Sequence, residues 1–201
     1  MDRRVENYLA LIANLDPGFE VVLLDETCDG LEQIADWTDG HSGIDALHVI
    51  SHGAVGGLLL GGSVINLDNL GEHAQTLARI GTALTETADI LLYGCDVAKG
   101  EVGQAFVTRL AALTSADVAA SNDLTGSAQL GGNGILEVHV GDVTAATALN
   151  QNVRGFHLIR KSTSCEANPA RFPAASWPLS RRTGSRCRVS RRARGTTRSR
   201  K

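Results

Sequence analysis

The 201-residue sequence lacks most of the features that would assign it to a functional class at once. No C-x-x-C pair is formed by its four cysteines, Cys28, Cys95, Cys165 and Cys187, so we expect neither a zinc site nor a thioredoxin-like centre. No apolar run reaches the roughly 18 residues that a membrane span requires. The first residues, M-D-R-R-V-E-N-Y, lack the apolar segment of a signal peptide. We therefore expect a domain with no metal, no other cofactor and no membrane span.

Charge is distributed very unevenly along the chain. Residues 1–153 contain 5 Lys and Arg against 21 Asp and Glu, a net charge of −16. Residues 154–201 contain 14 Lys and Arg against one acid, a net charge of +13. Apolar residues recur with the periods of helices and strands only in the first part, so we predict one folded domain over residues 1–153. An acidic domain of this kind is not expected to bind nucleic acid.

The remainder, residues 154–201, is rich in arginine and has no apolar periodicity. From residue 160 onward it contains 11 Arg but only two Lys, scattered among Ser, Thr, Ala, Gly and Pro. A nucleic-acid-binding tail is one interpretation of this composition. A disordered extension is the other, and a shifted reading frame in a GC-rich gene would produce it. The composition favours the disordered extension.

The domain alternates between helical and extended patterns. Helices are expected near residues 5–15, 29–39, 70–84 and 102–113, and strands at 20–25, 44–51, 90–93, 117–120 and 135–140. Two apolar runs around Gly61 and Gly62 predict a small hairpin. The run I-L-L-Y at 90–93 is typical of a strand buried on both faces of a parallel sheet. We therefore predict an α/β fold, a three-layer αβα sandwich with a mainly parallel sheet.

Two of the expected strands end at residues that can carry chemistry. The strand at 44–51 is followed by His52 and Gly53, and the strand at 90–93 by Gly94 and Cys95. Clefts in open parallel sheets lie at the carboxyl ends of the strands. Neighbouring strands would therefore place the imidazole of His52 and the thiol of Cys95 across one cleft.

This pair suits nucleophilic catalysis. An imidazole can take the proton of a thiol, whose ordinary pKa is about 8.5, and return it to a leaving amine. The main-chain N–H groups of Gly53 and Cys95 could hold a developing oxyanion, and the glycines suit close approach of a substrate backbone. Asp96 is expected to orient His52 or to bind a basic substrate side chain.

A plainer interpretation stands beside this one. A cysteine that ends a buried strand is often a small core residue, and a histidine before glycine often belongs to a turn. His41, in a turn, and His48, within a strand, are weaker catalytic candidates. Cys28 precedes a helix, but no histidine is close to it in the sequence.

Four segments resemble one bacterial family. They read H-V-I-S-H-G, L-L-Y-G-C-D-V-A, G-Q-A-F-V and A-D-V-A-A-S-N-D-L-T-G. They resemble domain of unknown function 4347, which is similar to the caspase–gingipain–separase clan of cysteine peptidases. The resemblance covers residues 5–143 and implies a caspase-like fold, with His52 as base, Cys95 as nucleophile, and Gly53 and Cys95 as oxyanion donors.

The sequence departs from the family's pattern in two places. Family members begin with one further buried strand, and Met1 falls where that strand should end. The resemblance therefore implies a fragment that lacks the first strand of its sheet. Gly134 stands where the family has a tryptophan, so we expect a packing defect there.

Two functions remain open at this point. The first is a cysteine peptidase-like domain, an autoprocessing module at the start of a large bacterial surface or secreted protein. Its substrate would be a polypeptide or its own chain in cis. The alternative is a non-catalytic surface or adhesion module. Secretion or surface location is implied by the family resemblance alone.

Overall fold

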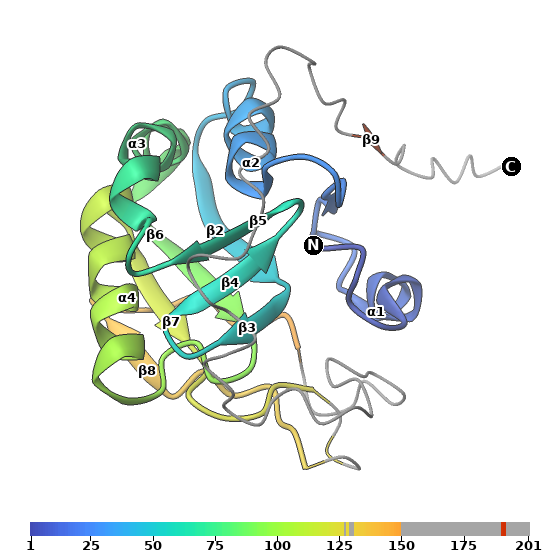
Figure 1. Ribbon diagram of the computed structural model, residues 1–201. Helices are drawn as coiled ribbons and strands as arrows, with labels where there is room; N and C mark the ends of the chain where they lie inside the picture. Colours follow the sequence, from blue (N-terminus) through green and yellow to red (C-terminus); the bar gives the residue numbers. More distant parts are fainter. Residues whose placement is uncertain (127, 129–130, 150–189, 192–201) are drawn as a thin grey trace, which may run out of the picture.

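A computed structural model of the chain describes residues 1–126, 128, 131–149 and 190–191 (Figure 1). Its helices are α1 (Tyr8–Asn14), α2 (Gly30–Thr38), α3 (Ala74–Ala83), preceded by a 3-10 turn η1 (Leu70–His73), and α4 (Gly100–Thr114). Helix α2 begins as expected, because the Asp29 carboxylate accepts a hydrogen bond from the Glu32 N–H group. Within the described ranges, no helix is long and apolar enough to cross a membrane.

The main sheet is mostly parallel. Its order is β2 (Ile44–Ile50), β6 (Leu84–Tyr93), β7 (Asp117–Ala120) and β8 (Val138–Val140). The first three strands are parallel, and β8 joins the edge antiparallel to β7. The predicted α/β class with a mainly parallel sheet is confirmed.

A small antiparallel sheet follows directly on β2. It consists of β3 (His52–Ala54), β4 (Gly57–Leu60) and β5 (Ser63–Asn66) in that order. The predicted hairpin is confirmed, since β4 and β5 pair across Gly61 and Gly62. Strand β3 was not expected, and it begins at the candidate catalytic residue His52.

The expected buried strand at residues 20–25 is wrong in extent. Strand β1 (Val22–Leu23) is two residues long and half-buried, and it pairs with β9 (Ser190–Arg191). Its other neighbour is Met1, whose amine donates to the Val22 carbonyl and whose carbonyl accepts from the Leu24 N–H group. With only these short neighbours to pair with, β1 does not extend over the whole of residues 20–25. Apart from β9, the prediction of a disordered tail lies outside the described residues.

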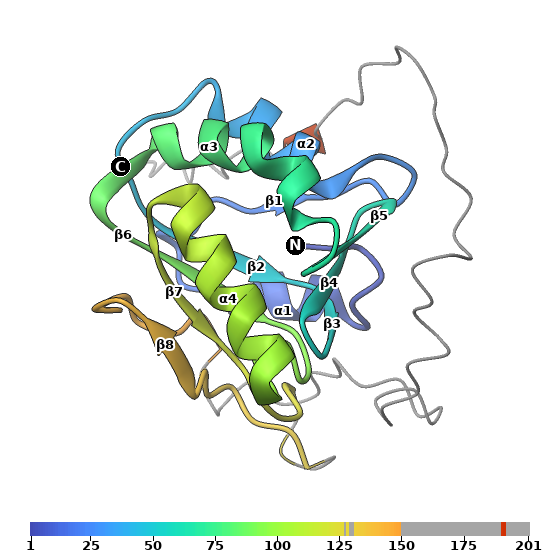
Figure 2. The same cartoon turned by 60° about the vertical axis from the view of Figure 1, so that its left-hand side comes forward.

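Helices lie on both faces of the main sheet (Figure 2). Cross-strand partners such as Val49 and Leu92 face α2, α3 and α4. Ile50 and Tyr93, one position further along, face α1 and residues 143–149. This alternation follows from the two-residue period of a strand.

Two large apolar residues of the helices are exposed to solvent. Leu9 in α1 is 56% exposed and Val102 in α4 is 51% exposed, whereas Leu11 is buried. Helix α1 is short, at seven residues or about two turns, and Leu11 is its buried residue.

A small apolar cavity of about 30 Å³ lies within the core between the sheet and helices α2, α3 and α4. It is lined by Val49, Leu92, Phe106 and Thr114, together with other aliphatic side chains. A cavity with this lining offers no hydrogen bonds to a polar substrate. The cavity is therefore a packing gap and not a candidate substrate site.

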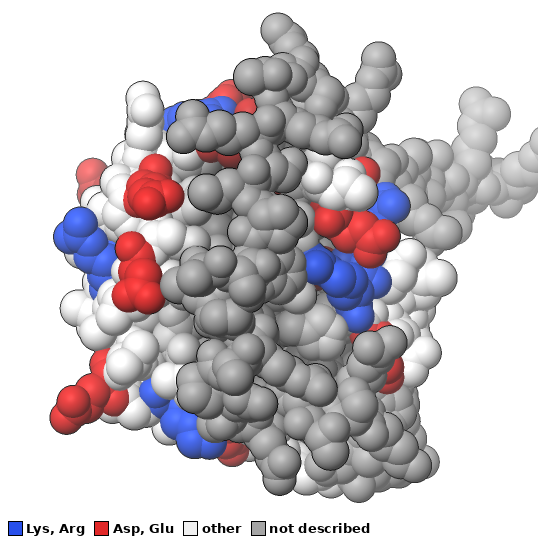
Figure 3. All heavy atoms as spheres, viewed as in Figure 1, with Lys and Arg blue, Asp and Glu red and all other residues white. Residues whose placement is uncertain are grey.

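Charged side chains of the described residues lie in small separate groups on the face shown in Figure 3. One ion-pair group links two helices, where the Arg79 guanidinium on α3 contacts Glu32, Asp36 and Asp39 at 2.6–3.1 Å. These contacts raise the pKa of Arg79 above its ordinary value, chiefly through its hydrogen bond to Asp39. Exposed pairs of this kind stabilise a fold only slightly.

Candidate functional site

The ends of β2 and β6 lie side by side at one edge of the main sheet. The two strands are parallel with Ile50 opposite Tyr93, and the Ser51 N–H group donates to the Tyr93 carbonyl at 3.3 Å. His52 and Cys95 each follow two residues after this last pair. The structure thus brings the two predicted catalytic residues to the same edge.

Two glycines allow the chain segments at this edge to touch. A Cβ atom on Gly53 would lie 2.6 Å from Val97 Cγ2 and 2.8 Å from the Cys95 carbonyl oxygen. A Cβ atom on Gly94 would lie 3.0 Å from the Gly53 Cα atom. We had expected these glycines to admit a substrate backbone, but the space at each is filled by the other strand end. Their main-chain contact explains the glycines without any substrate.

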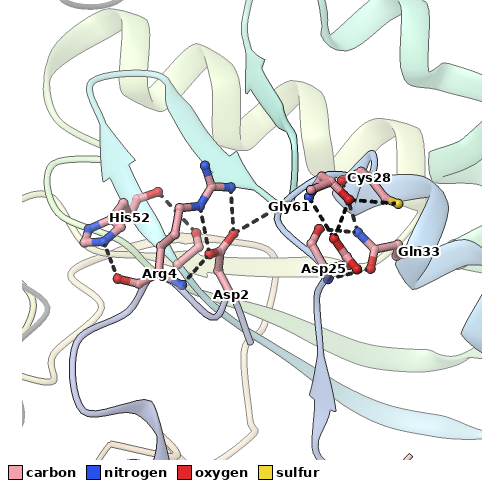
Figure 4. Close-up of polar contacts among 9 residues, drawn as sticks. Asp2, Arg4, Asp25, Cys28, Gln33, His52 and Gly61 are labelled. Atoms are coloured by element: carbon pink, nitrogen blue, oxygen red, sulfur yellow. Dashed lines mark hydrogen bonds and ion pairs between the residues drawn. The ribbon is translucent and has the colours of Figure 1, made fainter. Parts of the chain in front are cut away.

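The His52 ring is half-buried, and its Nε2 atom lies 3.1 Å from the Arg4 carbonyl oxygen (Figure 4). A carbonyl oxygen can only accept, so this contact assigns the hydrogen to Nε2. In the neutral ring Nδ1 then carries a lone pair. Nδ1 is therefore the nitrogen that can take a proton.

The Arg4 carbonyl is itself held in place by a buried aspartate. The Asp2 carboxylate is 1% exposed and accepts from the Arg4 main-chain N–H group at 2.8 Å and from the Arg4 guanidinium at 3.1 and 3.2 Å. It also accepts from the Gly61 N–H group at 2.8 Å, so residues 2–4 are attached to the turn between β4 and β5 (Figure 4). Sequence reasoning missed Asp2 and Arg4, because Gly61 lies 59 positions from Asp2 and His52 lies 48 positions from Arg4.

The Cys95 thiol is buried, with 3% of the residue exposed. Its Sγ–H group donates to the Thr125 carbonyl at a sulfur–oxygen distance of 3.8 Å. Thr125 is fully buried, and its hydroxyl is one of the polar groups without a hydrogen-bond partner in the part of the chain that the structure describes. Thr125 belongs to the S-N-D-L-T-G segment, but nothing in the sequence indicated its contact with Cys95.

The loop that carries Cys95 is attached to the loop after β7. The Asp96 N–H group donates to the Asp123 carbonyl at 2.8 Å, and the Ala98 N–H group donates to the Ser121 carbonyl at 2.9 Å. The Asn133 side chain in turn donates to the Asp123 carboxylate at 2.9 Å. The position of Cys95 therefore depends on residues 121–133 as well as on β6.

Asp96 has a contact other than the two that we expected. Its carboxylate binds the Lys99 ammonium at 2.8 Å, and its backbone has a φ of 58° in the left-handed region. The ring of His52 contacts Arg4 instead. The Asp96–Lys99 contact supports a role in the turn after Cys95.

The weaker histidine candidates are involved in ring contacts. His41 is stacked on Trp37 with ring centroids 4.0 Å apart, and His48 is stacked on Tyr93 at 5.9 Å. Burial lowers the pKa of His48 to about 4, although Asp89 opposes this. Among the residues described, no three His, Cys, Asp or Glu side chains form a group that could hold a metal ion.

The sequence model of one family, described as domain of unknown function DUF4347, matches residues 1–157. The chain belongs to the DUF4347 family. No curated protein and no solved structure matches the chain. The match covers every described residue named above except those of β9, so the candidate site lies within the DUF4347 domain.

Proposed function

We propose that this DUF4347 domain is a caspase-like cysteine peptidase domain with His52 and Cys95 as its catalytic dyad. Helices on both faces of a mainly parallel sheet support the caspase-like three-layer αβα sandwich. The observation that carries the proposal is the His52–Arg4 contact, because it leaves Nδ1 as a proton acceptor at the strand end next to Cys95. A base with a fixed tautomer beside a thiol is what nucleophilic cysteine chemistry requires.

The first half of the reaction forms a thioester. Cys95 Sγ turns from the Thr125 carbonyl toward His52 Nδ1, which takes the thiol proton. The thiolate attacks the scissile carbonyl carbon, and the carbonyl electron pair moves to oxygen, where the N–H groups of Gly53 and Cys95 hold the negative charge. When this intermediate collapses, the C–N bond breaks and the leaving amine takes the proton from His52.

The second half releases the product. A water molecule gives a proton to His52 Nδ1 and attacks the thioester carbon. The C–S bond then breaks, and the proton returns to Cys95 Sγ. The substrate class is a polypeptide, and cleavage of the protein's own chain in cis is the form we propose for an autoprocessing module of a secreted or surface protein.

The test is alkylation of Cys95 by iodoacetamide at pH 7, located by mass spectrometry. His52→Ala is expected to slow alkylation of Cys95 about a hundredfold, since a positioned base typically contributes 10²–10⁴-fold. His73→Ala, a histidine in η1, is the matched control and should leave the rate unchanged. Equal rates in the wild type and in His52→Ala would remove the catalytic proposal.

A non-catalytic surface or adhesion module is the second candidate. The observation that favours it is the contact of the Cys95 thiol, which is buried and donates to the Thr125 carbonyl, as a structural cysteine would. The two candidates differ in cleavage products, which are detected by mass spectrometry after incubation of the full chain and of casein. The peptidase produces fragments that Cys95→Ser does not, and the non-catalytic module produces none.

A further inference from the structure

Two polar residues interrupt the buried part of strand β6. Asp89 is 1% exposed and Tyr93 is fully buried, and both point to the sheet face that also carries Ile50 and Leu91. A buried carboxylate in a central strand is costly unless hydrogen bonds compensate it. The catalytic proposal uses neither side chain.

Both residues bind one segment, residues 143–149, which we call the strap. The Asp89 carboxylate accepts from the Thr144 N–H group at 2.9 Å and from the Ala145 N–H group at 2.7 Å. The Tyr93 hydroxyl oxygen accepts from the Ala148 N–H group at 2.8 Å. The strap ends in Leu149, which is 4% exposed and belongs to the apolar cluster on this face. The strap is therefore held to the sheet near both of its ends, where its main-chain N–H groups donate to side chains of β6.

His48 completes this arrangement from the neighbouring strand. Its Nδ1 atom lies 3.2 Å from the Tyr93 hydroxyl oxygen, and its ring lies nearly parallel to that of Tyr93. Because the Tyr93 oxygen already accepts from Ala148, its own hydrogen is free to be donated to His48 Nδ1. The relay from Ala148 N–H through the Tyr93 hydroxyl to neutral His48 gives the hydroxyl oxygen a donor and its hydrogen an acceptor.

We propose that the strap is an acid-releasable element, docked on the sheet while His48 is neutral and released when His48 is protonated. A proton on Nδ1 turns the acceptor of the Tyr93 hydroxyl into a donor. The hydroxyl oxygen must then accept from two N–H groups, and its hydrogen loses its partner. The unpaired Tyr93 hydroxyl raises the free energy of the docked state and not that of the released state, where water can bind the hydroxyl.

The surroundings of His48 set the direction of the pH dependence. Asp89 on β6 is the charged group that acts on it, Phe19 contributes an uncharged ring at 5.0 Å, and the strap contains no ionisable side chain. Burial holds the pKa of His48 at about 4, below its ordinary value of 6.5, and burial of Tyr93 raises its pKa to about 12, so the hydroxyl keeps its hydrogen. The docked state thus binds fewer protons, and docking weakens as the pH falls from 6.5 to 4.

The test is amide hydrogen exchange of the full chain between pH 7 and pH 4.5, expressed as protection factors. The protection of Ala145 and Ala148 is expected to fall about tenfold for each unit by which the pKa of His48 rises on release. Leu91 and Leu92 in β6 should keep their protection over the same range. Loss of protection at these leucines together with the strap would mean general unfolding and would overturn the proposal.

Three variants sharpen this test. His48→Gln should abolish the pH dependence of the Ala148 amide, which donates to the Tyr93 hydroxyl, whereas the control His73→Gln should retain it. Tyr93→Phe should lower the protection of Ala148 already at pH 7, because the acceptor is removed. A pH dependence in His48→Gln equal to that of the wild type overturns the proposal. If His48→Gln does not fold, unchanged Ala148 protection in Tyr93→Phe overturns it.

Discussion

The imidazole of His52 contacts a main-chain carbonyl, that of Arg4, and the position of this carbonyl depends on the Asp2 carboxylate. A single buried side chain therefore determines which nitrogen of the candidate base is available. The thiol of Cys95 likewise contacts a main-chain carbonyl, that of Thr125. At the scale of single residues, the candidate site is built from main-chain acceptors that distant loops supply.

Removing the Asp2 carboxylate should impair both folding and the candidate base. Asp2→Ala leaves the Gly61 and Arg4 N–H groups without their acceptor. We expect a loss of about 1–3 kcal/mol in the free energy of unfolding, measured with urea. We also expect slower iodoacetamide labelling of Cys95. Glu6→Ala, at an exposed acid nearby, is the control, and equal stability of the two variants would contradict the role of Asp2.

The contact between Gly53 and the Cys95 loop leads to a second prediction. Gly53→Ala adds a methyl group within 2.8 Å of main-chain atoms, so the strand ends must separate. Such overpacking costs about 1–3 kcal/mol, which a shift of the urea midpoint would reveal. Gly71→Ala, where nothing lies within 4 Å of the added methyl group, should leave the midpoint nearly unchanged. A neutral Gly53→Ala would show that the two strand ends are not in contact.

The strands and helices were predictable where one local period dominates. The apolar run at residues 90–93 predicted the end of β6. The first half of this strand contains Thr85, Glu86 and Thr87, so it has no apolar run that would predict a strand. The strap could not be predicted, because its partners Asp89 and Tyr93 are about 55 positions away. Long-range main-chain contacts of this kind leave no periodic pattern in the sequence.

Gly134 shows the same limit. Its replacement of a tryptophan predicted a packing defect, but a Cβ atom there would lie 2.4 Å from the carbonyl oxygen of Leu149, at the end of the strap. The expected defect is therefore wrong, since the strap occupies that space.

The opposite outcome is now expected of a larger side chain at this position. Gly134→Ala should destabilise the domain by about 1–3 kcal/mol, because the strap must move away from the added methyl group. The measurement is the urea midpoint of this variant beside that of Gly18→Ala, an exposed glycine with no atom within 4 Å of the added group. A gain in stability for Gly134→Ala would restore the packing-defect interpretation.

At the scale of the whole molecule, the core consists of two apolar clusters, one on each face of the main sheet. All of their described members lie within residues 1–149. The arginine-rich residues 154–201 were predicted to lie outside the domain on composition and charge alone. Strand β9, which lies in this arginine-rich part, pairs with β1 of the domain through two residue pairs. These pairs involve a half-buried strand and are not expected to determine the stability of the domain.

Deletion of residues 161–201 should therefore leave the thermal midpoint unchanged to within about 2 °C, less than the shift that roughly 1 kcal/mol would cause. The shortened chain carries 7 Lys and Arg against 21 Asp and Glu, so its self-repulsion is larger. The comparison is best made near 0.15 M salt, where charges more than about 8 Å apart are largely screened. A drop of several degrees at that salt concentration would mean that the deleted residues are docked on the domain.

The mutual contact of Gly53 and Gly94 also bears on how the H-G and G-C dipeptides should be read in other proteins. A side chain on either glycine would collide with the other strand end, so a chain whose strand ends lie this close needs both glycines, whether or not it cleaves peptides. The glycines are thus markers of architecture and carry no information about activity. A search for active relatives should instead score the histidine and the cysteine jointly, together with an acidic residue equivalent to Asp2.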